Sequence, residues 1–224
     1  MIKPKVFIAC DTTSSKKIEQ IIKESQNLKF NIGYKFGLEF LNSKNGRKFV
    51  SRLKNKITFG DYKLADIPNT CASAIKAVKD LRFNYITIHI SSGLKALKTA
   101  KKVSGSTKLI GVTILTSLDN KSLKEIGFDK NVKKLVLNQA RLAAKAKLDA
   151  VVCSPLEIKI VKKVFKKEII TPGIRLSGEK RGDQKRVMTP KQAFKNGATS
   201  IVIGRSLTEG NLSKNIQKLI KELK

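Results

Sequence analysis

The side chains best suited to chemistry lie in residues 61–70, which read DYKLADIPNT. They follow an apolar run at residues 57–59 and a glycine, so the segment is expected to start as a strand and end as a loop. Because side chains two apart on a strand share a face, Asp61 and Lys63 should point the same way. Asp66 follows on the strand-to-helix turn, within reach of the same cleft. Two carboxylates around one ammonium suit a proton donor that is held in place by fixed negative charge.

The same three residues have a simpler interpretation. They could form a surface ion pair before a helix, with Asp66 as the N-cap and Pro68 in the first turn. The bare DxKxxD spacing favours this interpretation. The ten residues together, with their surroundings in the chain, favour a catalytic site instead.

The elements that must position this segment alternate regularly along the chain. Most of the strand candidates are continuously apolar, which is typical of strands buried on both faces. We expect strands at residues 6–10, 32–36, 57–61, 85–89, 109–113, 150–153, 169–171 and 200–203. We expect helices at residues 15–26, 69–81, 93–102, 132–147, 155–165, 189–196 and 211–223.

Eight strand–helix units in 224 residues predict an α/β fold of the (β/α)8 TIM-barrel type. No linker, repeat or low-complexity block divides the chain, so we expect a single domain over residues 1–224. An open doubly wound sheet is the alternative, but it usually has fewer strands and a glycine-rich first turn. The first turn here reads CDTT at residues 10–13, without GxGxxG.

Polar residues follow the predicted strands at the end where barrel enzymes carry their chemistry. A purely structural barrel would not need such a bias, which therefore favours an active site at this end. From the first strand to the sixth, these residues are Asp11, Lys35, Asp61 with Lys63, His89, Thr113 with Thr116, and Ser154.

The loops after the last two predicted strands suit a phosphate, as they do in many barrels. Residues 171–175 (TPGIR) offer backbone amides around a glycine, and Arg205 follows Gly204 with a guanidinium suited to bidentate phosphate contact. Residues 173–184 contain three glycines and no apolar periodicity. They form either a disordered surface loop or a lid that closes on the ligand phosphate and excludes water.

The net charge of +30 would suit nucleic acid, yet its distribution does not. Only eight of the 47 basic residues are arginines, and the lysines are spread over almost every predicted helix. A nucleic-acid binder tends to cluster its charge and to offer aromatic side chains for stacking, but aromatics here are 6% of residues and Trp is absent. We therefore expect no nucleic-acid partner.

The apolar runs and the cysteines of the chain indicate where in the cell the protein works. No stretch of about 18 apolar residues occurs, so we expect no membrane span, and the N-terminus lacks the pattern of a leader peptide. The odd number of cysteines, with Cys10 and Cys153 inside apolar runs, favours packing thiols in a reducing cytoplasm. One histidine and three scattered cysteines form no recognisable zinc motif.

With these features in place, the chain resembles the orotidine 5′-phosphate decarboxylase family over nearly its whole length. DxKxxDIPNT is a highly specific motif, whereas the glycine–arginine pair alone would be weak. The matching segments are residues 61–70, 35–40, 112–117, 151–154, 171–175, 182–184 and 203–205.

The resemblance implies decarboxylation of orotidine 5′-monophosphate (OMP) to UMP in pyrimidine biosynthesis, without cofactor or metal. Lys63 would deliver the proton to pyrimidine C6, Asp61 and Asp66 would hold Lys63, and Lys35 would complete the charge array. Asp61 and Asp66 would also face the substrate carboxylate, and Asp61 and Lys35 would be among the residues that bind the substrate.

The resemblance further implies how the substrate and a second subunit are bound. Asp11 would bind the ribose hydroxyls and Thr116 the pyrimidine. The family is a homodimer, so Asp66, Ile67 and Thr70 would complete the neighbour's site. The phosphate would be bound by Arg175, Gln184, Gly204 and Arg205.

Two alternatives remain open. A sister barrel that shares DxKxxD, such as 3-keto-L-gulonate 6-phosphate decarboxylase or hexulose-6-phosphate synthase, needs magnesium and an acidic ligand at the end of the second strand. Our strand assignment places Lys35 there, and its ammonium would repel the metal. A non-catalytic basic protein that binds RNA or anionic surfaces is the second alternative, and it predicts salt-sensitive binding to any polyanion.

Overall fold

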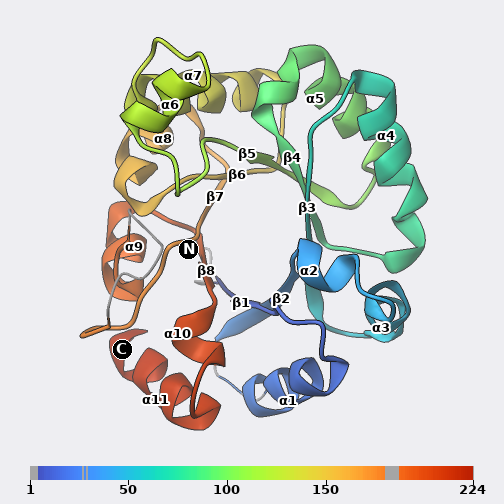
Figure 1. Cartoon of the computed structure of the whole chain (residues 1–224), viewed down its shortest axis with the longest axis vertical. Helices are drawn as coiled ribbons and strands as arrows, with labels where there is room; N and C mark the ends of the chain where they lie inside the picture. The colour runs from blue at the N-terminus through green and yellow to red at the C-terminus, as the bar shows by residue number, and fades with distance from the viewer. Residues whose placement is uncertain (1–4, 27, 29, 180–186, 224) are drawn as a thin grey trace.

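The strands close into a parallel barrel with neighbours in sequence order, and the helices surround it (Figure 1). The computed structural model describes residues 5–26, 28, 30–179 and 187–223. The strands are β1 (Lys5–Ala9), β2 (Asn31–Phe36), β3 (Ile57–Leu64), β4 (Tyr85–His89), β5 (Lys108–Val112), β6 (Ala150–Val152), β7 (Glu168–Thr171) and β8 (Ser200–Ile203). The predicted (β/α)8 fold is confirmed.

The helices follow the strands in the alternation that the sequence predicts. The longer ones are α1 (Ser15–Ser25), α4 (Pro68–Ala77), α5 (Gly93–Val103), α7 (Val132–Lys145), α8 (Ile158–Val164), α9 (Pro190–Asn196) and α11 (Leu212–Leu223). The shorter ones are α2 (Leu38–Leu41), α3 (Gly46–Arg52), α6 (Asn120–Glu125) and α10 (Arg205–Thr208), with 3₁₀ turns η1 (Lys79–Leu81), η2 (Ile90–Ser92) and η3 (Pro155–Glu157). None of the described helices is long and apolar enough to cross a membrane.

The strands are buried on both faces because each separates two cores. In β1, Phe7 and Ala9 point into the barrel, whereas Val6 and Ile8 pack outward against the helices. Phe7 meets Phe59 edge-on inside the barrel, with ring centroids 5.2 Å apart. This double burial explains why the strands read as unbroken apolar runs.

The inner core is closed at the amino ends of the strands by polar side chains. Glu168 at the start of β7 forms ion pairs with Lys5 and Lys108, and it accepts a hydrogen bond from the Tyr85 hydroxyl at 3.0 Å. We call these four residues the base cluster. Because they come from β1, β4, β5 and β7, they join strands across the barrel at the end opposite the polar strand ends that the sequence singles out.

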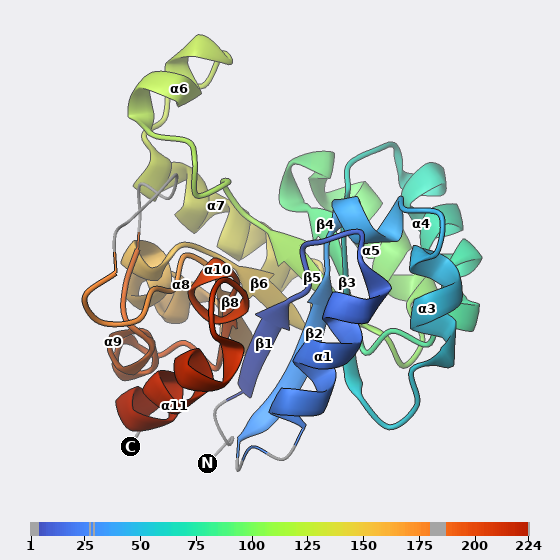
Figure 2. The same ribbon diagram turned by 60° about the horizontal axis from the view of Figure 1, so that its bottom comes forward.

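The structure differs from the prediction mainly in the short helices. The sequence gives no expectation of α2, α3, α6 or α10, because four to seven residues are too few for a helical period to show. α6 stands away from the barrel beyond the carboxyl end of β5 (Figure 2). β3 is also longer than predicted, since it extends to Leu64 rather than Asp61.

Candidate active site

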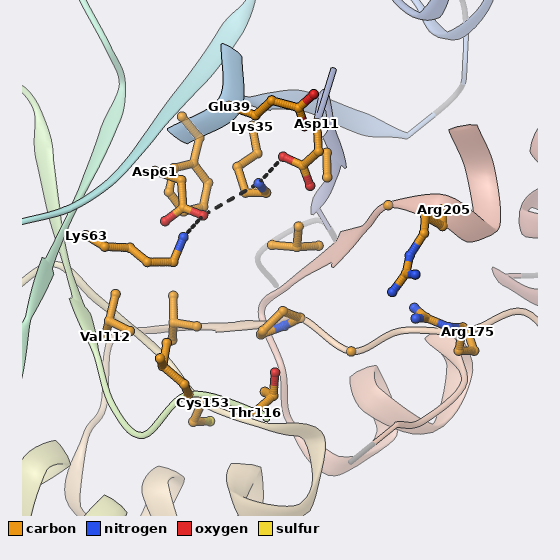
Figure 3. A pocket seen from close by; sticks show the side chains of 18 of the residues that line it. Asp11, Lys35, Glu39, Asp61, Lys63, Val112, Thr116, Cys153, Arg175 and Arg205 are labelled. Carbon is orange, nitrogen blue, oxygen red and sulfur yellow. Dashed lines mark hydrogen bonds and ion pairs between the residues drawn. The ribbon is translucent and has the colours of Figure 1, made fainter. Parts of the chain in front are cut away.

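A cavity of about 560 Å³ opens at the carboxyl ends of the strands. Charged side chains lie on two sides of it, and apolar ones form much of the floor (Figure 3). Residues that line it include Asp11, Lys35, Glu39, Asp61, Lys63, Val112, Ile114, Thr116, Val152, Cys153, Gly173, Arg175, Gly204, Arg205 and Glu209.

One side of the cavity holds a continuous chain of opposite charges. Lys63 Nζ lies 2.7 Å from Asp61 Oδ2, and Lys35 Nζ lies 3.5 Å from the same oxygen. Lys35 Nζ also donates to Asp11 Oδ1 at 3.0 Å. The order is therefore Asp11, Lys35, Asp61, Lys63, which we call the charge array. Asp61 and Lys35 are buried, while Lys63 is about one-third exposed to the cavity.

The charges of the array keep its buried members ionised. Burial opposes the charged form of Asp61, but Lys35 and Lys63 outweigh it and lower the pKa of this carboxyl below its usual value. Burial likewise opposes the charge on Lys35, but Asp61 and Asp11 outweigh it and raise the pKa of its ammonium. Both groups therefore stay charged at neutral pH.

Lys63 reaches Asp61 through an irregularity in β3. Gly60 pairs with Ile86 of β4, and the next pairing is Leu64 with Ile88, so β3 carries two extra residues at this point. Lys63 itself has φ +50°, in the left-handed region that side chains with a Cβ seldom occupy. The sequence correctly predicts that Asp61 and Lys63 share a side. The reason differs, because the prediction assumes the regular alternation of a strand, whereas a bulge brings the two side chains together.

The opposite side of the cavity carries the two arginines expected to bind phosphate. Arg175 lies after β7 and Arg205 begins α10 directly after β8, and the guanidinium groups lie on the same side of the cavity (Figure 3). Burial and the neighbouring charge of Arg205 lower the pKa of Arg175. Two like charges held side by side suit a doubly charged anion.

The structure brings most of the predicted site residues into one cavity. Asp11, Lys35, Asp61, Lys63, Thr116, Arg175, Gly204 and Arg205 all line it. Gln184 lies outside the described residues, as do residues 180–183 of the predicted lid.

The remaining three predicted site residues lie elsewhere. Asp66 and Ile67 lie just before α4 and Thr70 in its first turn; all three are exposed, and none lines the cavity. The expectation that Asp66 reaches the cleft of its own chain is therefore wrong. Its carboxylate turns back and accepts from the backbone N–H of Ile67 at 2.7 Å. The interpretation of Asp66 as the N-cap is also wrong, because Ile67 holds that position and Pro68 begins the helix.

Other polar residues at the strand ends do not line the cavity, and two of them form hydrogen bonds with the backbone instead. Thr113 donates to the carbonyl of Val152 at 2.7 Å, and Ser154 accepts from the N–H of Leu156 as it caps η3. His89 is half-buried, and burial and the charge of Lys63 lower its pKa. Not every polar residue at a strand end therefore belongs to the site.

Several residues around the cavity are not expected from sequence. Glu39 and Glu209 lie in or beside the short helices α2 and α10, which carry no periodic signal. Thr87 contacts both Asp61 and Lys63 from β4. A polar residue inside the apolar run 85–88 was the available signal. Among the described residues, no three or more His, Cys, Asp or Glu side chains form a group that could hold a metal ion.

Fold and site together define a (β/α)8-barrel protein whose cavity holds an ionised lysine–aspartate array facing two arginines. Residues 4–217 match the family described as Orotidine 5'-phosphate decarboxylase / HUMPS family, and the chain belongs to it.

Curated relatives agree with this family over nearly the full length. The chain is 41% identical over 222 residues to "Orotidine 5'-phosphate decarboxylase" of Wolbachia sp. subsp. Brugia malayi (strain TRS), covering 96% of each chain. It is 39% identical over 219 residues to the protein of the same name from Prochlorococcus marinus (strain MIT 9215), covering 92% of this chain and 89% of that one.

Solved structures share the fold. The orotidine 5'-phosphate decarboxylase of Lactobacillus acidophilus matches with a TM-score of 0.81 and 28% identity, over 98% of both chains. An orotidine 5'-monophosphate decarboxylase of Methanocaldococcus jannaschii, complexed with inhibitor BMP, matches with a TM-score of 0.79 over 99% of both chains. At 21% identity, this second likeness concerns the fold alone.

Proposed function

We propose that the charge array carries out the decarboxylation of OMP, with Lys63 as the proton donor. The activity itself follows from the family: the chain is a carboxy-lyase that converts OMP to UMP and carbon dioxide in pyrimidine biosynthesis. The observation that carries the mechanism is the 2.7 Å contact between Lys63 Nζ and Asp61, in the cavity that Arg175 and Arg205 also line.

In the proposed step, the bond between C6 and the substrate carboxylate breaks and carbon dioxide leaves. The electron pair stays on C6, where the Lys63 ammonium stabilises it and then transfers a proton to it. The neutral amine regains its proton from water. A charge fixed before the reaction is effective because no reorganisation is needed when the carbanion forms.

Asp61 and Lys35 support this step by setting the field around Lys63. Asp61 holds the ammonium in place, and Lys35 balances the buried carboxylate so that the site stays ionised. Asp61 also faces the substrate carboxylate, which leaves as a neutral molecule. The ammonium of Lys35 at the end of β2 disfavours a metal there, in line with a reaction free of cofactor and metal.

The rest of the substrate spans the cavity. We assign Asp11 to the ribose hydroxyls, Thr116 to the pyrimidine, and Arg175, Gly204 and Arg205 to the phosphate. This assignment is supported by the positions of these residues around one cavity. Gln184 keeps its proposed role in phosphate binding on the family resemblance alone.

We propose further that the site is completed in a homodimer. Ile67 is 66% exposed although it is apolar, and it lies between Asp66 and Thr70, which are also exposed. A second subunit packed here would cover Ile67 and receive Asp66 and Thr70 at its own cavity. We also propose that residues 1–224 work as one domain in the cytoplasm, a location supported by three buried free cysteines.

The test is the loss of OMP absorbance catalysed by the wild type, Lys63→Ala and an exposed control, Lys133→Ala, with and without EDTA. We expect Lys63→Ala to lose at least about a thousandfold in kcat, within the range of general acid catalysis combined with fixed charge. Lys133→Ala and EDTA should leave the rate unchanged.

Three outcomes would contradict the proposal. Activity in Lys63→Ala near that of the wild type would remove Lys63 from the reaction. Loss of activity in EDTA, with turnover of a sugar phosphate instead of OMP, would place the chain on the magnesium-dependent branch. Binding of any polyanion without UMP formation would favour a non-catalytic protein.

A further inference from the structure

The bulge in β3 faces a single residue of β4. Between the Gly60–Ile86 and Leu64–Ile88 pairings, β3 contributes residues 61–63 and β4 contributes only Thr87. A bulge removes backbone groups from the regular ladder, and a buried N–H that loses its ladder partner needs another acceptor. The residues affected here are those that carry the reaction.

The Thr87 hydroxyl meets this need and also bonds the catalytic carboxylate. Its Oγ1 accepts from the backbone N–H of Lys63 at 2.8 Å and donates to Asp61 Oδ1 at 3.0 Å. Thr87 is completely buried, so bulk solvent does not compete for either bond. A hydroxyl has a single hydrogen to donate. Because the Thr87 oxygen accepts the N–H of Lys63, this hydrogen remains available for Asp61.

The two oxygens of Asp61 therefore have different tasks. Oδ2 faces both lysines, at 2.7 Å from Lys63 Nζ and 3.5 Å from Lys35 Nζ. Oδ1 is held by Thr87. Without that bond the carboxylate could rotate about its side-chain torsions, and the backbone of Lys63 would lose a bond that fixes it at φ +50°.

We propose that Thr87 is a positioning residue, which fixes the Asp61 carboxylate and the backbone of Lys63 in their reactive arrangement through one hydroxyl. This inference rests on the proposed role of Lys63. It assigns no contact with substrate to Thr87, which acts through its two partners.

The test compares Thr87→Val, which keeps the shape and loses the hydroxyl, with Thr87→Ser, which keeps the hydroxyl. For Thr87→Val we expect kcat to fall by about tenfold or more, the scale of one hydrogen bond to a charged group, while KM for OMP changes less than about threefold. Thr87→Ser should stay within about threefold of the wild-type kcat. The acid limb of the pH profile of kcat should move to higher pH in Thr87→Val, because Asp61 loses a bond that favours its charged form.

A kcat of Thr87→Val within twofold of the wild type, in a folded protein by circular dichroism, would overturn the inference. A tenfold loss in Thr87→Ser as well would also overturn it, because the hydroxyl would then not be the group that matters.

If Thr87→Val does not fold, the comparison of Thr87→Ser with Thr87→Cys becomes the test, since the thiol is similar in size to the hydroxyl but a much weaker donor. Equal kcat in this pair would overturn the inference. Lys63→Ala distinguishes failure of this inference from failure of the proposed function. If Lys63→Ala is active, the proposed function is wrong. If Lys63→Ala is inactive while Thr87→Val is active, only the role of Thr87 is wrong.

Discussion

Asp61 is the residue on which the other charges of the site depend. It contacts Lys63, Lys35 and Thr87; Lys35 and Thr87 are buried with it, while Lys63 is partly exposed to the cavity. Leaving one charge of such a group unpaired in the interior costs several kcal/mol, so its members should be sensitive to single changes. The array is thus expected to be rigid before substrate arrives, which is what preorganised electrostatic catalysis requires.

Acid stability should report the ionised state of Asp61. Because its pKa in the folded protein lies below the unfolded value, Asp61 contributes stability above the unfolded pKa, and this contribution is lost as the pH falls through the folded pKa. Urea unfolding at pH 6, 4 and 3 should therefore show a smaller loss of stability on acidification in Asp61→Asn than in the wild type. Asp129→Asn, on the exposed surface, is the control and should follow the wild type. An equal loss in wild type and Asp61→Asn would contradict this prediction.

Sequence foretold the charged residues of the site better than the contacts that support them. Asp61 and Lys63 were identifiable because two opposite charges follow an apolar run at a spacing of two. The bulge that joins them was not, because it depends on pairing with β4, which is distant in sequence. The error over Asp66 has the same origin, since the turn before α4 directs this side chain to the backbone of Ile67. The catalytic and binding roles of the site residues stay predictions.

At the scale of elements, the junction of β2 and α2 sets the outer end of the charge array. Gly37 joins them, and a Cβ at this position would lie 2.7 Å from Asp11 Oδ1 and 3.4 Å from Lys35 Nζ. Its backbone is extended, with φ −86°, so alanine is allowed there by conformation. The absence of a side chain at Gly37 therefore makes room for the contact between Asp11 and Lys35.

Gly37→Ala should consequently impair substrate binding with little loss of stability. The half-exposed Asp11 can swing away, so we expect the free energy of unfolding to change by less than about 1 kcal/mol. KM for OMP should rise about tenfold, as for loss of one hydrogen bond to a charged group. Steady-state kinetics of Gly37→Ala, Asp11→Ala and the double variant provide the measurement. If the two changes act through the same contact, the double variant should resemble Asp11→Ala. Additive effects would show that Gly37 acts elsewhere.

The strands were predictable to within a few residues because burial on both faces leaves an apolar run between polar ends. β4 and β8 match their predicted bounds, and the others differ by one to three residues. Long helices were equally accessible through their periodic apolar faces. α2 and α10 were not, although both line the site, because their positions depend on the barrel that surrounds them.

At the scale of the whole molecule, the two ends of the barrel have different tasks. The base cluster joins four strands at their amino ends, while the cavity opens at their carboxyl ends. Between them lies the inner core of Phe7, Phe59 and other apolar side chains. The residues of the site and the residues that close the barrel therefore lie at opposite ends of its axis, as is usual in this fold.

The proposed homodimer predicts complementation between inactive subunits. Lys63→Ala and Asp66→Ala proteins, each inactive alone, are mixed in equal amounts and allowed to exchange. Each hybrid dimer should regain one intact site of two, so random mixing restores about a quarter of wild-type activity. Mixing Lys63→Ala with Asp61→Ala is the matched control and should restore nothing, because both residues belong to the same cavity. Absence of recovery in the first mixture, despite proven exchange, would contradict the shared site.

Closure of the barrel determines when the enzyme can become active during its synthesis. β8 pairs with both β7 and β1, so the barrel is complete only when the last strand meets the first. Asp61 and Lys63 emerge from the ribosome with the third strand, whereas Arg205 emerges directly after the eighth. The nascent chain thus carries its reactive lysine for most of its synthesis without the guanidinium that faces it, and it becomes competent only with its final strand–helix unit.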